Sequence, residues 1–163
     1  MDDLFAPPGN AWQPVSPALA RLRRTVLVTV AGLLVGALAA LALLLPLPVR
    51  IWLPLVLLVL LAVPPGWRLI GRNARSWGYA ERDEDLYVKH GAMFRVLVVV
   101  PYGRMQYVDV QSGPLERAFG VASVHLHTAS PGTSAQIPGL PAGEAARLRD
   151  RLTSLGESQA AGL

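Results

Sequence analysis

The chain has 163 residues, of which 52% are hydrophobic and only 16% are charged. Soluble domains carry about 25% charged residues, so this composition indicates a membrane protein. There is no cysteine, which excludes disulfides, thiolate zinc sites, iron–sulfur clusters and cysteine nucleophiles. Lys89 is the only lysine beside many arginines, a bias that favours a bacterial source with a GC-rich genome.

The net charge is +4, which raises the question of nucleic-acid binding. A nucleic-acid binder carries its basic residues on the surface that reads the nucleic acid. Residues 77–155 hold eight acids and eight bases, so that part is neutral, and the excess arginines flank the apolar runs instead. We therefore expect no nucleic-acid partner.

Two apolar runs lie near the N-terminus. Residues 26–45 have Thr29 as their only polar side chain, and their helical length of about 30 Å equals the thickness of a hydrocarbon core. Residues 51–67 form a second run, which the Pro64–Pro65–Gly66 cluster is expected to kink or end near the membrane surface. Because the link between the runs is short, we predict a transmembrane hairpin over residues 20–75.

The arginines next to this hairpin predict its orientation. Six lie beside its two outer ends and only Arg50 lies at its turn; the six are Arg21, Arg23, Arg24, Arg68, Arg72 and Arg75. The positive-inside rule then gives a multi-pass protein of the inner (cytoplasmic) membrane with both termini in the cytoplasm.

Small residues recur on the first run at Gly32, Gly36 and Ala40. Such a stripe allows two helix backbones to approach closely. We expect contact with the second helix of the same chain, with a homo-oligomer as the alternative.

Residues 76–156 have the pattern of short antiparallel strands followed by an amphipathic helix over residues 143–155, whose apolar stripe consists of Ala145, Leu148, Leu152 and Leu155. The proline-rich residues 1–19 are interpreted as a disordered cytoplasmic leader and residues 157–163 as a disordered tail. The predicted core consists of Val88, Val96, Val98, Val108, Val110, Leu115, Phe119, Val124, Leu126, Leu148 and Leu152.

Several short segments in this part carry a resemblance to a known family. They are Gly78-Tyr79, Leu86 to Gly91, Val100 to Gln106, Gln111 to Arg117, Phe119 to Ala122 and Ile137 to Leu140. Together they resemble the bacterial pleckstrin-homology (PH)-like membrane proteins typified by YdbS, in which two membrane helices precede the domain. The resemblance implies a mainly β PH-like roll or barrel with a C-terminal capping helix.

No catalytic or cofactor motif is present, so we expect neither an enzyme nor a bound cofactor. His125 and His127 share one strand face without an evident third ligand, and we expect no metal site. The candidate interaction or lipid-contact residues are Arg68, Arg72, Arg75, Arg104, Glu116 and Arg117. For Arg104 we favour an internal ion pair, and for the loop holding Glu116 and Arg117 a structural corner anchored by Leu115 and Phe119.

These observations predict a membrane-anchored cytoplasmic interaction module that binds a protein partner. One alternative is a module that senses anionic membrane lipids through the juxtamembrane arginines. Another is a structural subunit of a larger membrane complex, with Gly32 and Gly36 at a contact between helices.

Overall fold

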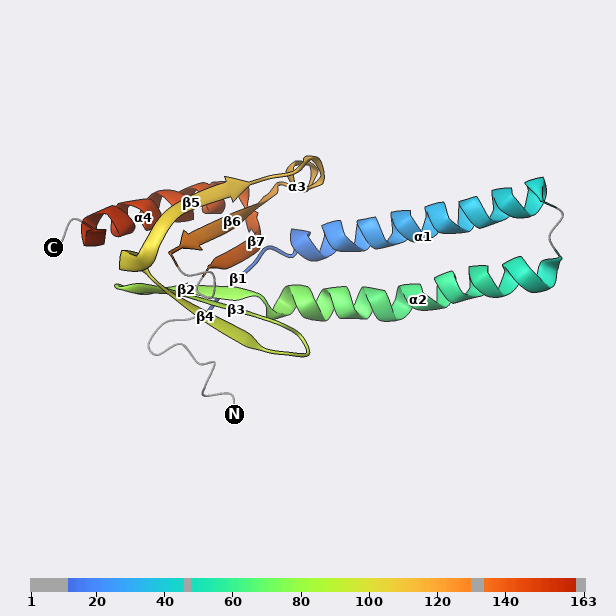
Figure 1. Cartoon of the computed structure of the whole chain (residues 1–163), viewed down its shortest axis with the longest axis horizontal. Helices are drawn as coiled ribbons and strands as arrows, with labels where there is room; N and C mark the ends of the chain where they lie inside the picture. The colour runs from blue at the N-terminus through green and yellow to red at the C-terminus, as the bar shows by residue number, and fades with distance from the viewer. Residues whose placement is uncertain (1–11, 46–47, 130–133, 161–163) are drawn as a thin grey trace. The chain divides into compact units, whose positions relative to one another are not determined.

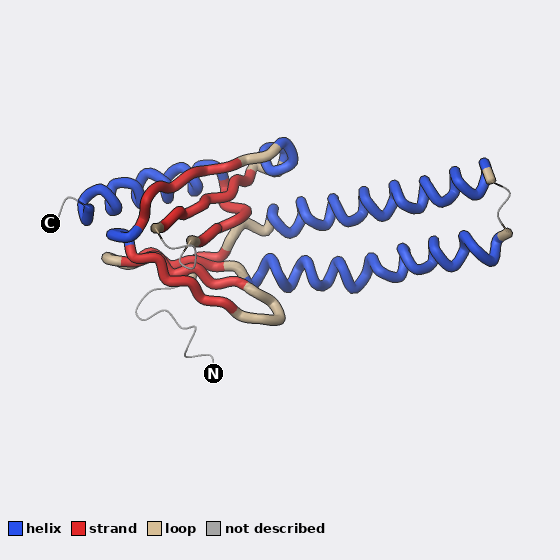
Figure 2. Tube along the Cα trace, viewed as in Figure 1, coloured by secondary structure: helices blue, strands red, loops and turns tan. Residues whose placement is uncertain are grey.

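The computed structural model describes residues 12–45, 48–129 and 134–160. The chain divides into two compact units, one formed by Ala20–Arg72 and the other by the described residues on either side of it. Figure 1 labels the elements and Figure 2 separates helix from strand. The two units are described in turn.

The first unit is built from two long helices, α1 (Ala18–Leu44) and α2 (Val49–Ser76). Both are long and apolar enough to cross a membrane. The Pro64–Pro65–Gly66 cluster, expected to kink or end the helix, does not end it, because α2 continues through both prolines to Ser76. Membrane helices tolerate proline, since neighbouring groups satisfy the freed backbone positions.

The two helices approach each other at glycines of α2. A Cβ at Gly66 would lie 3.2 Å from Leu27 Cδ2, and one at Gly71 would lie 2.5 Å from Arg24 Nη2. A Cβ at Gly32 or Gly36 would meet nothing within 4 Å, and Ala40 is exposed as well. The expected contact between helices at the Gly32–Gly36–Ala40 stripe is therefore not formed in this chain.

The second unit contains two antiparallel sheets and a C-terminal helix, which confirms the predicted PH-like fold (Figures 1 and 2). The sheets have the orders β1-β2-β3-β4 and β5-β6-β7. The strands are β1 (Gln13–Pro14), β2 (Gly78–Glu81), β3 (Asp85–His90), β4 (Val96–Pro101), β5 (Met105–Gln111), β6 (Val121–Thr128) and β7 (Ala135–Pro141). A 3₁₀ turn, η2 (Tyr102–Arg104), and a short helix, α3 (Pro114–Ala118), complete the connections.

The helix α4 (Ala142–Ala160) closes the core. Ala145, Leu148 and Leu152 are completely buried, as the helical stripe in the sequence predicted. They pack in a core that also holds Val88, Val124 and Leu126 from the predicted set, together with Leu86, Val100, Ile137 and Leu140. The sheets and α4 thus share one apolar interior.

Two predicted core residues lie at the surface. Val96 is 41% exposed and Leu115 is 56% exposed, while Phe119 is half-buried. Val96 begins β4 directly after a hairpin turn, and Leu115 lies on the outside of the five-residue α3. A residue at the end of a strand or in a very short helix has fewer packing neighbours, so its side chain is less buried than the apolar pattern predicts.

The predicted leader and tail are partly ordered. Gln13 and Pro14 pair with β2, Val15, Ala18 and Leu19 are buried, and Ser16 N donates to Gly139 O at 3.0 Å. At the other end α4 continues to Ala160. Residues 1–11 and 161–163 lie outside the described part of the chain.

Candidate interaction surfaces

Strand β5 forms one edge of the second sheet. It pairs with β6 on one side, and no other described strand pairs with it. The register shifts between Met105 and Tyr107, so a bulge places Gln106 outside the regular ladder. An unpaired edge presents backbone N–H and C=O groups that another extended segment can bind.

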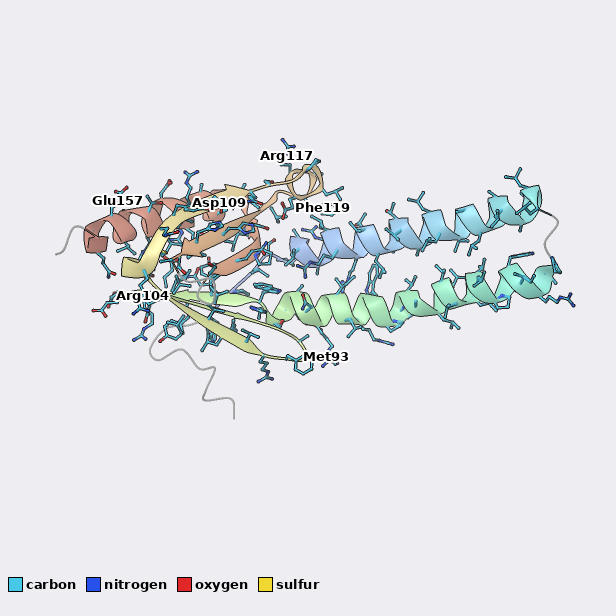
Figure 3. The ribbon with its side chains drawn as sticks, viewed as in Figure 1. Met93, Arg104, Asp109, Arg117, Phe119 and Glu157 are labelled. Atoms are coloured by element: carbon cyan, nitrogen blue, oxygen red, sulfur yellow. The ribbon has the colours of Figure 1, made fainter. Side chains whose placement is uncertain are left out.

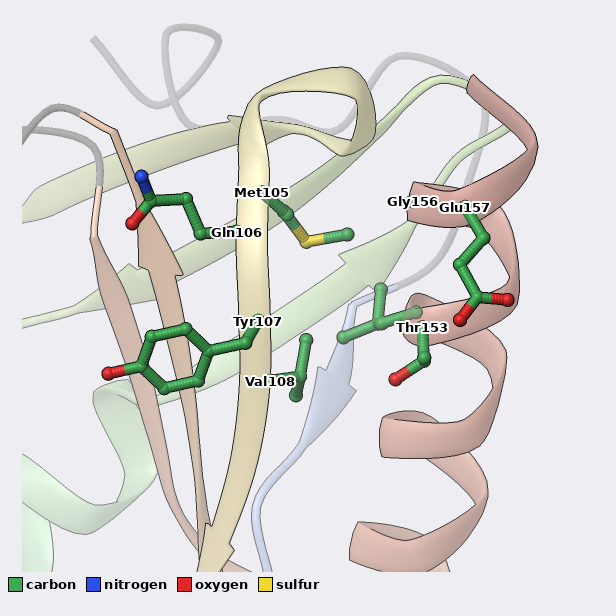
Figure 4. A pocket seen from close by; sticks show the side chains of 8 residues that line it. Met105, Gln106, Tyr107, Val108, Thr153, Gly156 and Glu157 are labelled. Atoms are coloured by element: carbon green, nitrogen blue, oxygen red, sulfur yellow. The ribbon is translucent and has the colours of Figure 1, made fainter. Parts of the chain in front are cut away.

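A cavity of about 270 Å³ lies between this edge and the end of α4. Its lining consists of Met105, Gln106, Tyr107 and Val108 from β5, and of Leu152, Thr153, Gly156 and Glu157 from α4. Figure 4 shows Met105 and Val108 on the side of β5 that faces α4, with Thr153 and Glu157 across from them. The floor is apolar, and polar side chains stand at the rim.

The outer face of the same sheet carries a small polar and aromatic cluster. The rings of Tyr107 and His127 stack with centroids 4.2 Å apart, and His127 Nε2 lies 3.3 Å from Asp109 Oδ1. The hydrogen bond that Gln111 donates to Asp109 lowers the pKa of that carboxyl, and His125 and His127 act in the same direction. Among the described residues no group of three or more His, Asp or Glu side chains is placed to hold a metal ion.

Comparison with known proteins agrees with this architecture. The family model described as "Bacterial PH domain" matches residues 24–155, which include most of both helices and nearly all of the β unit. The chain belongs to the bacterial PH domain family. It is also 35% identical over 81 residues to the UPF0699 transmembrane protein YdbS of Bacillus subtilis (strain 168). That alignment spans half of each chain, and no solved structure matches.

Two of the candidate residues lie in the β5–β6 corner of this bacterial PH domain. Both carboxylate oxygens of Glu116 accept hydrogen bonds within the corner. Oε2 accepts one from Gly113 N at 2.8 Å, and Oε1 accepts one from Ser123 Oγ at 2.9 Å. Arg117 is exposed on the outer side of α3 (Figure 3). The bonds of Glu116 therefore fit the interpretation of this loop as a structural corner. Of its two expected apolar anchors, Phe119 is half-buried and Leu115 is exposed.

The four candidate arginines outside the corner are exposed. Arg104 ends η2, and within the described part of the chain no ion pair involves it, so the favoured internal pair is not formed. Arg68, Arg72 and Arg75 all lie on the continuous α2, at spacings of four and three residues that bring them to one face.

The sequence patterns did not predict the cavity beside β5. Tyr107 and Val108 belong to an alternating strand pattern, Thr153 lies in the predicted amphipathic helix, and Glu157 lies in the segment interpreted as a disordered tail. Only the order of strands in the sheet shows that β5 is an edge, and only packing shows that α4 stands beside it.

Proposed function

We propose that this bacterial PH domain protein is a membrane-anchored interaction module that binds a protein partner at the cytoplasmic face of the inner membrane. The partner contributes an extended segment, which adds to β5 as a further strand and places one side chain in the cavity next to α4. The observation that carries the proposal is the unpaired edge of β5 directly beside that cavity.

The backbone and the cavity supply different parts of recognition. Main-chain hydrogen bonds to a sheet edge give affinity for any extended segment, and pockets for alternate side chains give specificity. At about 270 Å³ the cavity is smaller than the roughly 300–1,000 Å³ of pockets that enclose drug-sized ligands. It suits a single side chain better than a whole small molecule.

The lining indicates the chemistry of that side chain. Met105, Val108 and Leu152 offer apolar contact, while Glu157 and Gln106 at the rim are exposed polar groups. A long side chain with an apolar stem and a basic or hydrogen-bonding end fits both parts. The partner segment is therefore expected to carry Lys, Arg or Gln at the position that enters the cavity.

Membrane anchoring strengthens binding to partners in the same membrane. Helices α1 and α2 are long and apolar enough to cross the bilayer, so the domain stays near its surface. Restricting two binding partners to one surface raises their effective concentration without new contacts.

The test uses the full chain in lipid nanodiscs and peptides selected against it from a random library. Gly156→Phe fills the cavity. Gly156→Ala is the matched control, because its Cβ would make ordinary contacts of 3.6 Å with Met105 Cε and 3.8 Å with Tyr102 O. We expect affinity to fall at least about tenfold in Gly156→Phe and to stay within about twofold in Gly156→Ala.

Hydrogen exchange gives the second measurement. Binding as an added strand should slow exchange of backbone amides in β5 and leave those in β4, in the other sheet, unchanged. Selected peptides that bind both variants equally, or that protect another strand, would contradict the proposal.

A second candidate function is sensing of anionic lipids by Arg68, Arg72 and Arg75, which are exposed on the continuous α2. Each basic residue near an anionic leaflet contributes about 1 kcal/mol, and salt weakens this attraction. Native mass spectrometry of the purified full chain should then show bound anionic lipid that is lost when all three are changed to Gln. Equal lipid retention by both proteins would remove this candidate.

A further inference from the structure

The turn between β3 and β4 carries an exposed apolar pair. Met93 is 76% exposed and Phe94 is 82% exposed, and Val96 directly after the turn is 41% exposed. Figure 3 shows Met93 at the tip of this hairpin. Adjacent large apolar side chains with this exposure mark a contact with another apolar phase or surface.

The tip has a fixed backbone. Gly91 adopts a φ of +103°, and a Cβ at this position would collide with the carbonyl oxygen of Phe94. A glycine is therefore required for the chain to close the turn. The conformation that exposes Met93 and Phe94 is built into the turn, so the pair is presented without a further rearrangement.

The same tip is tied to the end of the second membrane helix. Gly91 N donates to Oγ of Ser76, the last residue of α2, at 3.0 Å, and the rings of Trp77 and His90 stack with centroids 4.6 Å apart. Gly78 at the start of β2 pairs with Lys89. Because β3 runs antiparallel to β2, the residues after His90 extend past the start of β2, on the side where Ser76 joins the domain.

The charges around the tip are basic. Arg75, Lys89 and Arg95 lie within a few residues of the contacts just described, and no acid occurs from Gly91 to Pro101. Lys89 Nζ lies 4.2 Å from the centroid of the Trp12 ring. Basic side chains beside an apolar tip match the surface of an anionic leaflet, which attracts Lys and Arg.

We propose that Met93 and Phe94 insert into the interfacial layer of the leaflet from which α2 emerges. Ser76 lies nine residues after Trp67, a helical length of about 14 Å. The turn closes between Gly91 and Phe94, so Ala92 and Met93 extend at most about 7 Å beyond Gly91, and the interfacial layer adds about 5–7 Å outside the hydrocarbon. These two lengths together match the helical length from Trp67 to Ser76, so the chain is long enough for the turn to reach the surface of the leaflet from which α2 emerges.

This contact adds a non-covalent attachment to the two covalent connections of the domain, through α1 and through α2. A further contact with the leaflet restricts the tilt of the domain that the two helix connections alone would allow. The expected consequence is a domain held in one orientation, with the same face toward other membrane proteins. This inference concerns a surface other than the β5 edge, and it stands or falls independently of partner binding there.

The test places a fluorescent label on the full chain reconstituted in liposomes. The chain has no cysteine, so Met93→Cys gives one labelling site and leaves Phe94 in place. The control is Asp83→Cys, an exposed position in the turn at the other end of β3. Two quenchers are compared, a nitroxide on a shallow lipid position and a water-soluble one.

We expect the lipid nitroxide to quench the label at position 93 several times more strongly than the label at position 83, and the water-soluble quencher to show the reverse order. Phe94→Ser in the Met93→Cys protein should reduce quenching by the lipid. Equal access of the water-soluble quencher to both labels would overturn the proposal. Protection of position 93 from both quenchers would also overturn it, because a protein surface would then cover the tip.

Discussion

Arg147 on α4 and Glu81 at the end of β2 form an ion pair that joins the C-terminal helix to the first sheet, with Nη2 2.5 Å from Oε1. The same guanidinium donates from Nε to Glu144 Oε2 at 3.0 Å, and Glu144 Oε1 accepts from Tyr79 Oη at 2.7 Å. Arg151 Nε lies 3.0 Å from Glu81 Oε2. The Glu81 side chain is only 8% exposed, so its charge depends on these partners.

Replacing Arg147 by Met should therefore weaken the attachment of α4. The change keeps much of the side-chain length but leaves the poorly exposed Glu81 with fewer donors, and hydrogen bonds to charged groups contribute about 1.5–3 kcal/mol. We expect the free energy of unfolding of the domain to fall by about 1–3 kcal/mol. Denaturant-dependent hydrogen exchange of β6 amides in the detergent-solubilised full chain measures it.

Arg149→Met is the matched control for this prediction. Arg149 is exposed and pairs with its neighbour Asp150, so its replacement should change stability by less than about 0.5 kcal/mol. Equal effects of the two substitutions would mean that the ion pair to Glu81 contributes nothing specific.

The same cluster predicts acid sensitivity. The hydrogen bond from Arg147 lowers the pKa of Glu144, and the one from Tyr79 adds to the effect. The native state therefore binds this proton less readily than the unfolded state. The stabilisation is complete above the ordinary glutamate pKa of about 4.3 and is lost as the pH falls through the lowered native value.

The measurement compares the free energy of unfolding near pH 6 and near pH 3 for the native chain and for Glu144→Gln. The difference between the two pH values should be smaller in the variant, because it lacks this titrating group. Asp83→Asn, in an exposed turn, should leave the difference unchanged. A Glu144→Gln protein as acid-sensitive as the native one would refute the assignment.

The buried side of α4 gives a third prediction. Leu148 is completely buried between the sheets and the helix, so Leu148→Ala should lower the free energy of unfolding by about 2–5 kcal/mol. Hydrogen exchange of β6 amides again provides the measurement. A loss below about 0.5 kcal/mol would show that α4 does not dock as described.

Much of this fold could be predicted because periodic patterns depend on local spacing. The stripe Ala145, Leu148 and Leu152 predicted the buried side of α4, and the alternation around Val124 and Leu126 predicted the inner face of β6. The continuation of α2 past Pro64 could not be predicted in this way, since proline tolerance depends on the surroundings of the helix.

The candidate sites were harder to predict, because they depend on which elements become neighbours. For Arg104 an internal ion pair was favoured, but no ion pair involves it in the described structure. Thr153 and Glu157 line the cavity only because α4 lies beside the edge of β5, and the sequence does not show that these two elements are neighbours. Met93 lies in the turn because β4 begins only at Val96, and the pattern of apolar residues around it does not fix where that strand starts.

The contact between Gly139 and Leu19 gives a fourth prediction. Gly139 has a φ of +70°, and a Cβ there would lie 2.6 Å from Leu19 Cβ; Gly120 has nearly the same φ, +67°, with open space around it. Gly120→Ala should cost about 1–2 kcal/mol for the left-handed backbone alone. Gly139→Ala should cost about 1–3 kcal/mol more, because it also displaces Leu19.

The excess cost of Gly139→Ala over Gly120→Ala, measured by hydrogen exchange in β7 and β6, isolates the packing of Leu19. Equal costs for the two glycines would mean that Leu19, at the start of α1, does not pack on β7 in solution.

The orientation of the membrane helices is the last prediction. Six arginines flank the outer ends of the hairpin, and Arg50 alone lies at its turn. Because translocation disfavours basic residues close to a span, both ends of the chain should lie in the cytoplasm. A single cysteine added after Leu163 should resist a membrane-impermeant thiol reagent in intact cells and react after lysis.

An Arg50→Cys protein serves as the matched control and should react in intact cells, since it places the thiol at the turn between α1 and α2. Changing Arg21, Arg23, Arg24, Arg68, Arg72 and Arg75 to Gln together removes the asymmetry. In that protein a fraction of the C-terminal cysteine should become accessible from outside. Reaction of the C-terminal cysteine in intact cells carrying the native arginines would reverse the orientation and place the PH domain outside the cytoplasm.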